Sequence, residues 1–126
     1  MKSRVVKLIY RLAKMCVGLP QSIHVIAICS GGRMVGKYIT KYFKMHGIKA
    51  SYFETWPDLV NKKAYIAKMN FSKSDYIGTV LLAEDAIWRG AAVEEMKEIL
   101  NVMKHKKVYL ATLLDLNKKA DFSIFN

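Results

Sequence analysis

Apolar residues recur along the chain in two patterns, one typical of amphipathic helices and the other of buried strands. Residues 3–16 place apolar side chains on one helical stripe and cations on another, which predicts a helix. The same periodicity predicts helices over 34–46 and 91–104. Short apolar runs predict buried strands at 23–29, 49–54, 76–83, 107–114 and 122–125.

The order of these elements predicts the fold class. Strand, helix, strand, strand, helix and strand in succession indicate an α/β protein, with a twisted parallel sheet and helices on both faces. The length of 126 residues favours one domain, residues 1–126. The segment 55–75 fits the pattern least well. Pro57 could begin a helix that reaches Met69, whereas the Asn and Ser residues from 61 to 74 favour a partly irregular segment.

Composition excludes several classes of protein. Apolar residues make up 52% of the chain, which is too many for a disordered protein. No apolar run approaches the roughly 18 residues that span a bilayer, so we expect no membrane association. Charged residues interrupt the N-terminal segment where a signal peptide would need an apolar run. Two cysteines form no disulfide framework, which favours the cytoplasm. So short a chain leaves apolar surface to cover, so we expect a homodimer.

The positive charge is concentrated in the first two-fifths of the chain. Lys and Arg number 21 against 10 acidic residues, a net charge of +11. Ten cations precede Glu54, which is the first acidic residue. An excess of this kind indicates an anionic partner, such as a phosphorylated substrate or a nucleic acid.

Two segments that follow predicted strands carry candidate chemistry. Ser30, Gly31 and Gly32 come directly after the first strand and lead into a helix, where backbone amides can approach a phosphate. Glu84 and Asp85 follow another strand, and small residues come next at a predicted helix start. Adjacent carboxylates beside a buried strand are costly unless they meet ligand hydroxyls or a cation. Because ligands bind at the carboxyl ends of parallel strands, we expect both segments to lie close together.

Three stretches of the chain resemble the type I phosphoribosyltransferases. VLLAEDAIWRGAAVEE, residues 80–95, looks like the signature of that family for phosphoribosyl pyrophosphate (PRPP). IAICSGGRMVGKYITKYF is similar to the family's first strand, its glycine-rich pyrophosphate loop and the next helix. VYLATLLDLNKKADF resembles the strand and tail of the purine-type members. The resemblance therefore implies PRPP or nucleotide binding, and transfer of phosphoribosyl to a purine-type base with release of pyrophosphate.

The resemblance also implies roles for particular residues. Glu84 and Asp85 would act at the catalytic centre by holding the ribose hydroxyls, and Asp85 would reach a Mg²⁺ cofactor. The residues implied to bind the 5′-phosphate are Ala86, Ile87, Trp88, Arg89, Gly90, Ala91 and Ala92. Those implied to bind pyrophosphate are Ser30, Gly31, Gly32 and Arg33. Segment 55–75 would form a flap in which Lys62 or Lys63 contacts pyrophosphate, and Phe122 would lie near the base.

The chain departs from the family pattern at several of these positions. Trp88 stands where an acid usually handles a proton, and Arg89 and Ala92 replace threonines. Ser30 stands where an arginine often precedes the glycines. The sequence ends at Asn126, so we expect the segment that usually completes the base pocket to be reduced or absent. We therefore expect weak catalysis, in a fold retained mainly for binding.

Two alternative functions fit other features. Gly31 to Lys37 reads GGRMVGK, which has the spacing of a P-loop, and this suggests a nucleotidase; Tyr38, however, replaces the required hydroxyl residue. The other alternative is a non-catalytic protein with the same fold that binds nucleic acid or a nucleotide through its basic N-terminal half.

Overall fold

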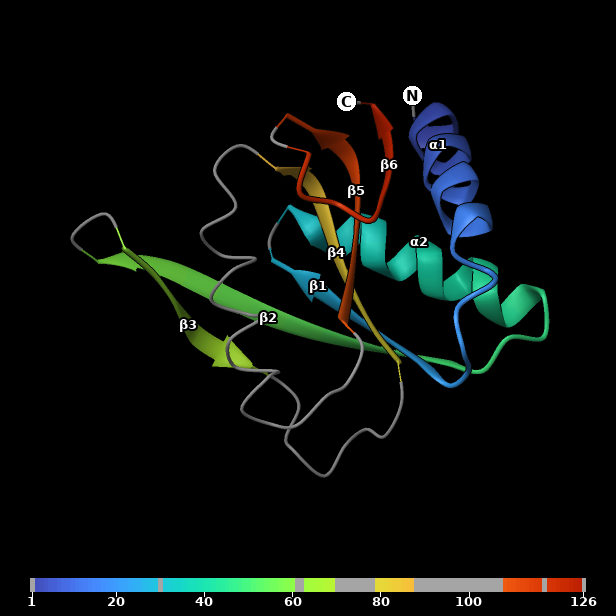
Figure 1. The fold of residues 1–126 in the computed structure, drawn as a ribbon, viewed down its shortest axis with the longest axis horizontal. Helices are drawn as coiled ribbons and strands as arrows, with labels where there is room; N and C mark the ends of the chain where they lie inside the picture. The colour runs from blue at the N-terminus through green and yellow to red at the C-terminus, as the bar shows by residue number, and fades with distance from the viewer. Residues whose placement is uncertain are drawn as a thin grey trace.

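The computed structural model describes residues 2–29, 31–60, 63–69, 79–87, 108–116 and 118–125 (Figure 1). Helices and strands alternate as far as β2, and the described elements after it are all strands. In order, they are α1 (Lys2–Met15), β1 (Ile23–Ile28), α2 (Gly32–Met45), β2 (Ala50–Val60), β3 (Lys63–Met69), β4 (Thr79–Ile87), β5 (Val108–Asp115) and β6 (Phe122–Phe125).

The strands form one sheet in the order β3-β2-β1-β4-β5-β6. Every neighbouring pair from β2 to β6 is parallel, and only β3 runs antiparallel to its neighbour β2. The prediction of an α/β fold with a parallel sheet is therefore confirmed. All six residues of β1 are buried, which explains why this central strand is apolar throughout except at His24, whose ring hydrogen-bonds Ser51 Oγ (2.6 Å).

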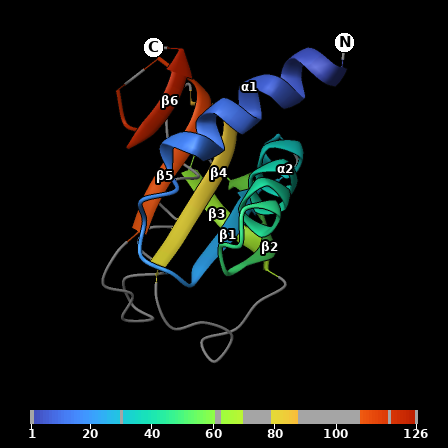
Figure 2. The ribbon, with the colours of Figure 1, turned by 90° about the vertical axis from the view of Figure 1, so that its right-hand side faces the viewer.

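The two described helices cover the same face of the sheet (Figure 2). α2 packs on β1, β2 and β4, and α1 packs on α2, β5 and β6. The helix predicted over 91–104 for the opposite face lies outside the described residues. Neither α1 nor α2 is long and apolar enough to cross a membrane.

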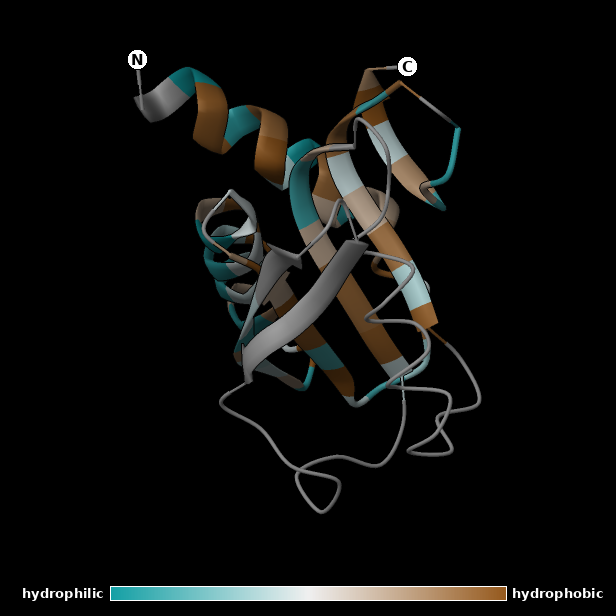
Figure 3. Ribbon diagram, turned by 90° about the vertical axis from the view of Figure 1, so that its left-hand side faces the viewer, coloured by the Kyte–Doolittle hydropathy of each residue, from teal (hydrophilic) through white to brown (hydrophobic). Residues whose placement is uncertain are grey.

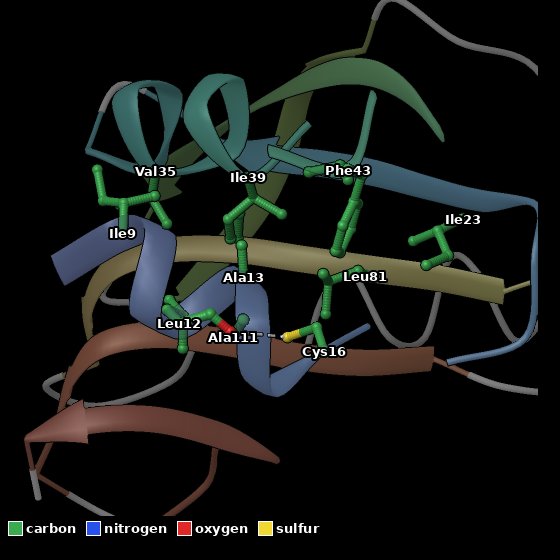
Figure 4. Close-up of a cluster of buried hydrophobic side chains, with 12 residues drawn as sticks. Ile9, Leu12, Ala13, Cys16, Ile23, Val35, Ile39, Phe43, Leu81 and Ala111 are labelled. Carbon is green, nitrogen blue, oxygen red and sulfur yellow. Dashed lines mark hydrogen bonds between the residues drawn. The ribbon is translucent and has the colours of Figure 1, made fainter. Parts of the chain in front are cut away.

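The core lies between this helical layer and the sheet. In Figure 4, Leu81 of β4 appears between Phe43 of α2 and Cys16 of α1, and all three side chains are fully buried. Leu12 of α1 and Ile39 of α2 are fully buried in the same cluster. The Cys16 thiol also donates a hydrogen bond to the Leu12 carbonyl oxygen (3.3 Å). Apolar residues colour much of the central strands brown in Figure 3. Burial of the apolar stripes therefore fixes which side of each helix faces the sheet.

The segment 55–69 differs from its sequence-based prediction. No helix from Pro57 forms within residues 55–60 and 63–69, because β2 continues to Val60 and pairs with β3 in an antiparallel arrangement. The Asn and Ser residues that favoured an irregular segment lie outside the described residues. The pairing register shifts between Trp56 and Pro57. Proline lacks the N–H that a regular ladder needs, and an irregularity in the pairing accommodates it. Residues 70–75, the rest of the predicted flap, lie outside the described residues.

We expect Leu12→Ala to lower the free energy of unfolding by about 2–5 kcal/mol, because it opens a cavity between α1 and the sheet. Leu116→Ala is the matched control, since Leu116 is exposed and its truncation should change stability by less than about 0.5 kcal/mol. Chemical denaturation followed by circular dichroism measures both variants. Equal losses would mean that α1 does not dock as described.

Candidate functional site

The candidate site lies where β1 ends and β4 continues. Pairing between these strands stops at Ala27 and Ala83, and β4 runs on through Ile87 beside β5. Glu84 and Asp85 therefore lie inside the last part of a strand. The sequence predicted them to lie in a loop after the strand, and this detail was wrong. Their pairing with β5 keeps them extended, and the first turn of α2 takes the place that β1 leaves.

Two glycines allow the start of α2 to contact β4 directly. A Cβ atom built on Gly32 would overlap the Ala83 carbonyl oxygen. One built on Gly31 would lie 2.6 Å from Asp85 Oδ1 and 3.0 Å from Glu84 Oε1. At Gly32 the overlap is with backbone, so this position needs glycine for the approach, whereas the atoms nearest Gly31 are the ends of two acidic side chains that can shift. The structure thus brings Gly31 and Gly32 together with Glu84 and Asp85, as the sequence predicted, although Ser30 lies outside the described residues.

The two carboxylates share a crowded, partly buried environment. The Asp85 amide donates to Glu84 Oε1 (3.0 Å), and the Ala86 amide donates to Asp85 Oδ1 (2.8 Å). Asp85 is exposed and Glu84 is half-buried. Burial raises the pKa of Glu84 to about 8, and the adjacent Asp85 side chain adds to the rise. An acid with this pKa beside an exposed carboxylate is a common feature of ligand sites.

A second polar group lies beside the glycines, and the sequence did not predict it. Arg33 Nε donates to Glu54 Oε2 of β2 (2.8 Å), and the Tyr52 hydroxyl donates to the same oxygen (2.6 Å). The hydrogen bond from Tyr52 and the Arg33 guanidinium hold the pKa of Glu54 below its ordinary value. Burial and the Glu54 charge raise the pKa of the nearby Cys29 thiol, which argues against a reactive thiolate. The one available signal was that Glu54 is the first acid after ten cations.

The remaining predicted residues lie apart from this group or outside the described residues. Phe122 begins β6, two strands from β4, and its ring packs 6.2 Å from that of Tyr109 against the core. Ala86 is half-buried and Ile87 ends β4. Lys63 begins β3, where only its backbone is described. The predictions for Lys62, Trp88, Arg89, Gly90, Ala91 and Ala92 fall on residues outside the description.

The P-loop alternative is wrong. α2 begins at Gly32, so most of GGRMVGK is helix rather than a loop that could wrap a phosphate. Gly36 is buried in that helix against Tyr52 and Ala27, and Lys37 is exposed on its outer surface. The motif matched in spacing alone, since close packing of the helix on the sheet explains Gly36.

Comparison with known proteins identifies the fold. No protein-family model matches the sequence, and neither does any curated protein. Among solved structures, a hypoxanthine-guanine phosphoribosyltransferase from Bacillus anthracis matches with a TM-score of 0.77 and 18% identity, covering 99% of this chain and 78% of that one. A purine phosphoribosyltransferase from Pyrococcus horikoshii matches with a TM-score of 0.77 and 16% identity, covering 96% of this chain and 81% of that one. The chain has the type I phosphoribosyltransferase fold.

A third solved structure extends the likeness to this fold. A hypoxanthine phosphoribosyltransferase from Staphylococcus aureus has a TM-score of 0.73 and 18% identity, covering 98% of this chain and 73% of that one. The resemblance at residues 80–95 thus predicted the phosphoribosyltransferase fold correctly. The roles of individual residues in it remain predictions.

We expect Gly32→Ala to lower the free energy of unfolding by about 1–3 kcal/mol, because the new methyl group meets the Ala83 carbonyl and forces α2 away from β4. Gly18→Ala is the control, since a Cβ there meets nothing within 4 Å. Thermal and chemical denaturation compare the two. A Gly32→Ala protein as stable as the control would contradict the close approach.

The raised pKa of Glu84 predicts a pH dependence of stability. Folding favours the protonated carboxyl, so its contribution is complete below the ordinary value of 4.5 and is lost as pH rises through about 8. Glu84→Gln, which mimics the protonated form, should therefore be more stable than the parent chain at pH 9 by up to a few kcal/mol, at about 1.4 kcal/mol per pKa unit. Denaturation at several pH values checks this, and the difference should vanish near pH 4.

Proposed function

We propose that this chain binds PRPP or a nucleotide at the junction of α2 and β4. The observation that carries the proposal is the contact of Gly31 and Gly32 with the acidic pair Glu84 and Asp85. It places a helix N-terminus, which attracts phosphate, directly beside carboxylates, which attract sugar hydroxyls or a cation. A phosphorylated sugar carries both kinds of group.

The phosphate part of the ligand would meet the first turn of α2. The first amides of a helix have no partner within the helix, and they point towards its N-terminus with the positive end of the helix dipole. Gly31 and Gly32 present no side chain that would cover these amides. Arg33 lies in the same turn with its side chain 43% exposed, so its guanidinium has nitrogens left for an anion beyond the Nε that Glu54 accepts from.

The sugar would meet the acidic pair. Carboxylate oxygens are strong acceptors for ribose hydroxyls, and the two side chains lie within reach of one ligand because both approach Gly31. These residues also fit Mg²⁺, which proteins bind through one or two carboxylates together with oxygens of a substrate phosphate. Asp85, the more exposed of the two, would hold the ion, which would neutralise charge on pyrophosphate.

The reaction that fits this ligand is transfer of phosphoribosyl to a purine-type base. The bond from the ribose C1 to pyrophosphate breaks, a base nitrogen bonds to C1, and that nitrogen loses its proton. Negative charge on Asp85 would stabilise the positive charge that develops on the ribose, while Glu84, whose raised pKa keeps it largely protonated near neutral pH, would hydrogen-bond a ribose hydroxyl. The names of the similar structures, hypoxanthine-guanine and purine phosphoribosyltransferases, support a purine-type base. We expect slow turnover, because Trp88 supplies no carboxylate to accept the proton that the base loses, and such groups contribute about 10²–10⁴-fold.

Calorimetric titration with PRPP and Mg²⁺ tests the proposal. Asp85→Asn should weaken binding about 10- to 100-fold, since a hydrogen bond to a charged group contributes about 1.5–3 kcal/mol. Asp121→Asn is the control, because Asp121 accepts from the Leu110 amide (2.8 Å) at the start of β6 and asparagine keeps an oxygen there. Absence of PRPP binding by the unaltered chain, or equal loss in both variants, would refute the proposal.

A further inference from the structure

We propose that the outer surface of α1 and α2 binds single-stranded nucleic acid, independently of the site at α2 and β4. The surface combines a row of aromatic side chains with stripes of cations, and it lies on the helical face of the sheet (Figure 2). Proteins that bind single strands without reading sequence use these two components, because aromatic rings stack on bases while cations follow phosphates.

The aromatic row runs along one side of α2 and includes one ring from α1. Tyr38, Tyr42 and His46 follow each other at four-residue spacing, so they share a helical face. The Tyr42 and His46 rings lie 4.2 Å apart, centroid to centroid, and are tilted by 33°. Tyr10 of α1 packs against Tyr42 at 5.5 Å and against Tyr38 at 6.2 Å. The three tyrosines are half-buried and His46 is exposed, so the row reaches the surface.

Cations flank this row on both helices. Lys37, Lys41 and Lys44 are exposed along α2, separated by about one helical turn, and Lys41 Nζ lies 5.9 Å from the centre of the Tyr38 ring. Arg11 and Lys14 are exposed on α1, near Tyr10 in the sequence. Neither helix contains Asp or Glu, so no carboxylate on them offsets this charge.

A groove follows the lysines on the side of α2 that faces β2. Its volume is about 460 Å³. The side chains that line it are Lys37, Thr40, Lys41, Lys44, Met45 and Tyr52, and none of these is acidic. The lysine stripe therefore has rings on one flank and an open groove on the other, which suits a chain of phosphates with bases turned to one side.

The positive charge of this surface and the burial of the apolar side of α1 argue against two other partners. A two-fold symmetric dimer would place the same patch against itself, which brings the cations of α1 and α2 face to face. Insertion of α1 into a membrane would need its apolar side, but Ile9, Leu12 and Ala13 on that side are fully buried in the core. A polyanion with flat apolar groups meets neither objection.

Fluorescence anisotropy with a labelled oligonucleotide of about 12 nucleotides tests the proposal. RNA, single-stranded DNA and a DNA duplex are compared between about 50 and 200 mM salt, with polyglutamate and phosphatidylserine vesicles as other polyanions. The triple variant Lys37→Gln, Lys41→Gln, Lys44→Gln should weaken binding and reduce the salt slope by about 2, at about 0.7 per phosphate contact. Lys118→Gln is the control, because Lys118 is exposed on the loop before β6, which is not among the strands that α2 contacts, and this variant should bind as the parent does.

Variants of the aromatic row separate stacking from charge. Tyr42→Leu should weaken single-strand binding about 5- to 150-fold, the equivalent of about 1–3 kcal/mol per stacked base, and Tyr42→Phe should restore it. His46→Ala changes an exposed ring and should lower affinity without affecting the fold, as checked by circular dichroism. Duplex, polyglutamate or vesicle binding as tight as single-strand binding would overturn the proposal. A concentration-dependent dimer of the parent chain that the Tyr42→Leu substitution dissociates would also overturn the proposal.

Discussion

The close approach of α2 to β4 is the constraint on which the rest of the site depends. β1 stops at Ile28 while β4 continues to Ile87, so the edge of β4 beyond Ala83 needs another partner on that side. The first turn of α2 lies there, and glycine at position 32 leaves room for the Ala83 carbonyl. Burial raises the pKa of Glu84 at this junction, and the contact brings a helix N-terminus beside the acidic pair. Fold and candidate chemistry therefore have one structural cause.

Local sequence patterns predicted most of the fold because each pattern agreed with its tertiary setting. The run from Ile23 to Ile28 is apolar except for His24 and becomes a fully buried central strand. The hairpin of β2 and β3 was missed because Pro57 carries a local signal for a turn or helix start, whereas pairing with β3 determines its structure. The sequence predicted that β4 ends at Ala83, whereas it continues to Ile87. The reason is similar, since Glu84 and Asp85 resemble loop residues although pairing with β5 keeps them extended.

The candidate site was predictable only in part. Residues that follow predicted strands could be brought together by a general rule, whereas partners that meet only through helix docking could not. Gly31 and Glu84 each follow a predicted strand, and the rule that parallel strands end at one edge brings them together. Glu54 carried no such signal, because its partner Arg33 lies 21 residues away and the pair depends on the placement of α2 over β2. The aromatic row was equally hidden, since Tyr10 meets Tyr38 and Tyr42 only after both helices have docked on the same face.

The placement of the cations argues that a small phosphorylated ligand does not account for the charge of +11. Ile39 and Phe43 fix the buried side of α2, so Lys37, Lys41 and Lys44 must lie on its outer side. Arg33, the cation nearest the glycines in the sequence, is paired with Glu54. Backbone amides and carboxylates thus dominate the site at β4, where interactions act at short range. Side-chain charges dominate the helical face, where they would add up over the long anion that we propose and would be screened by salt.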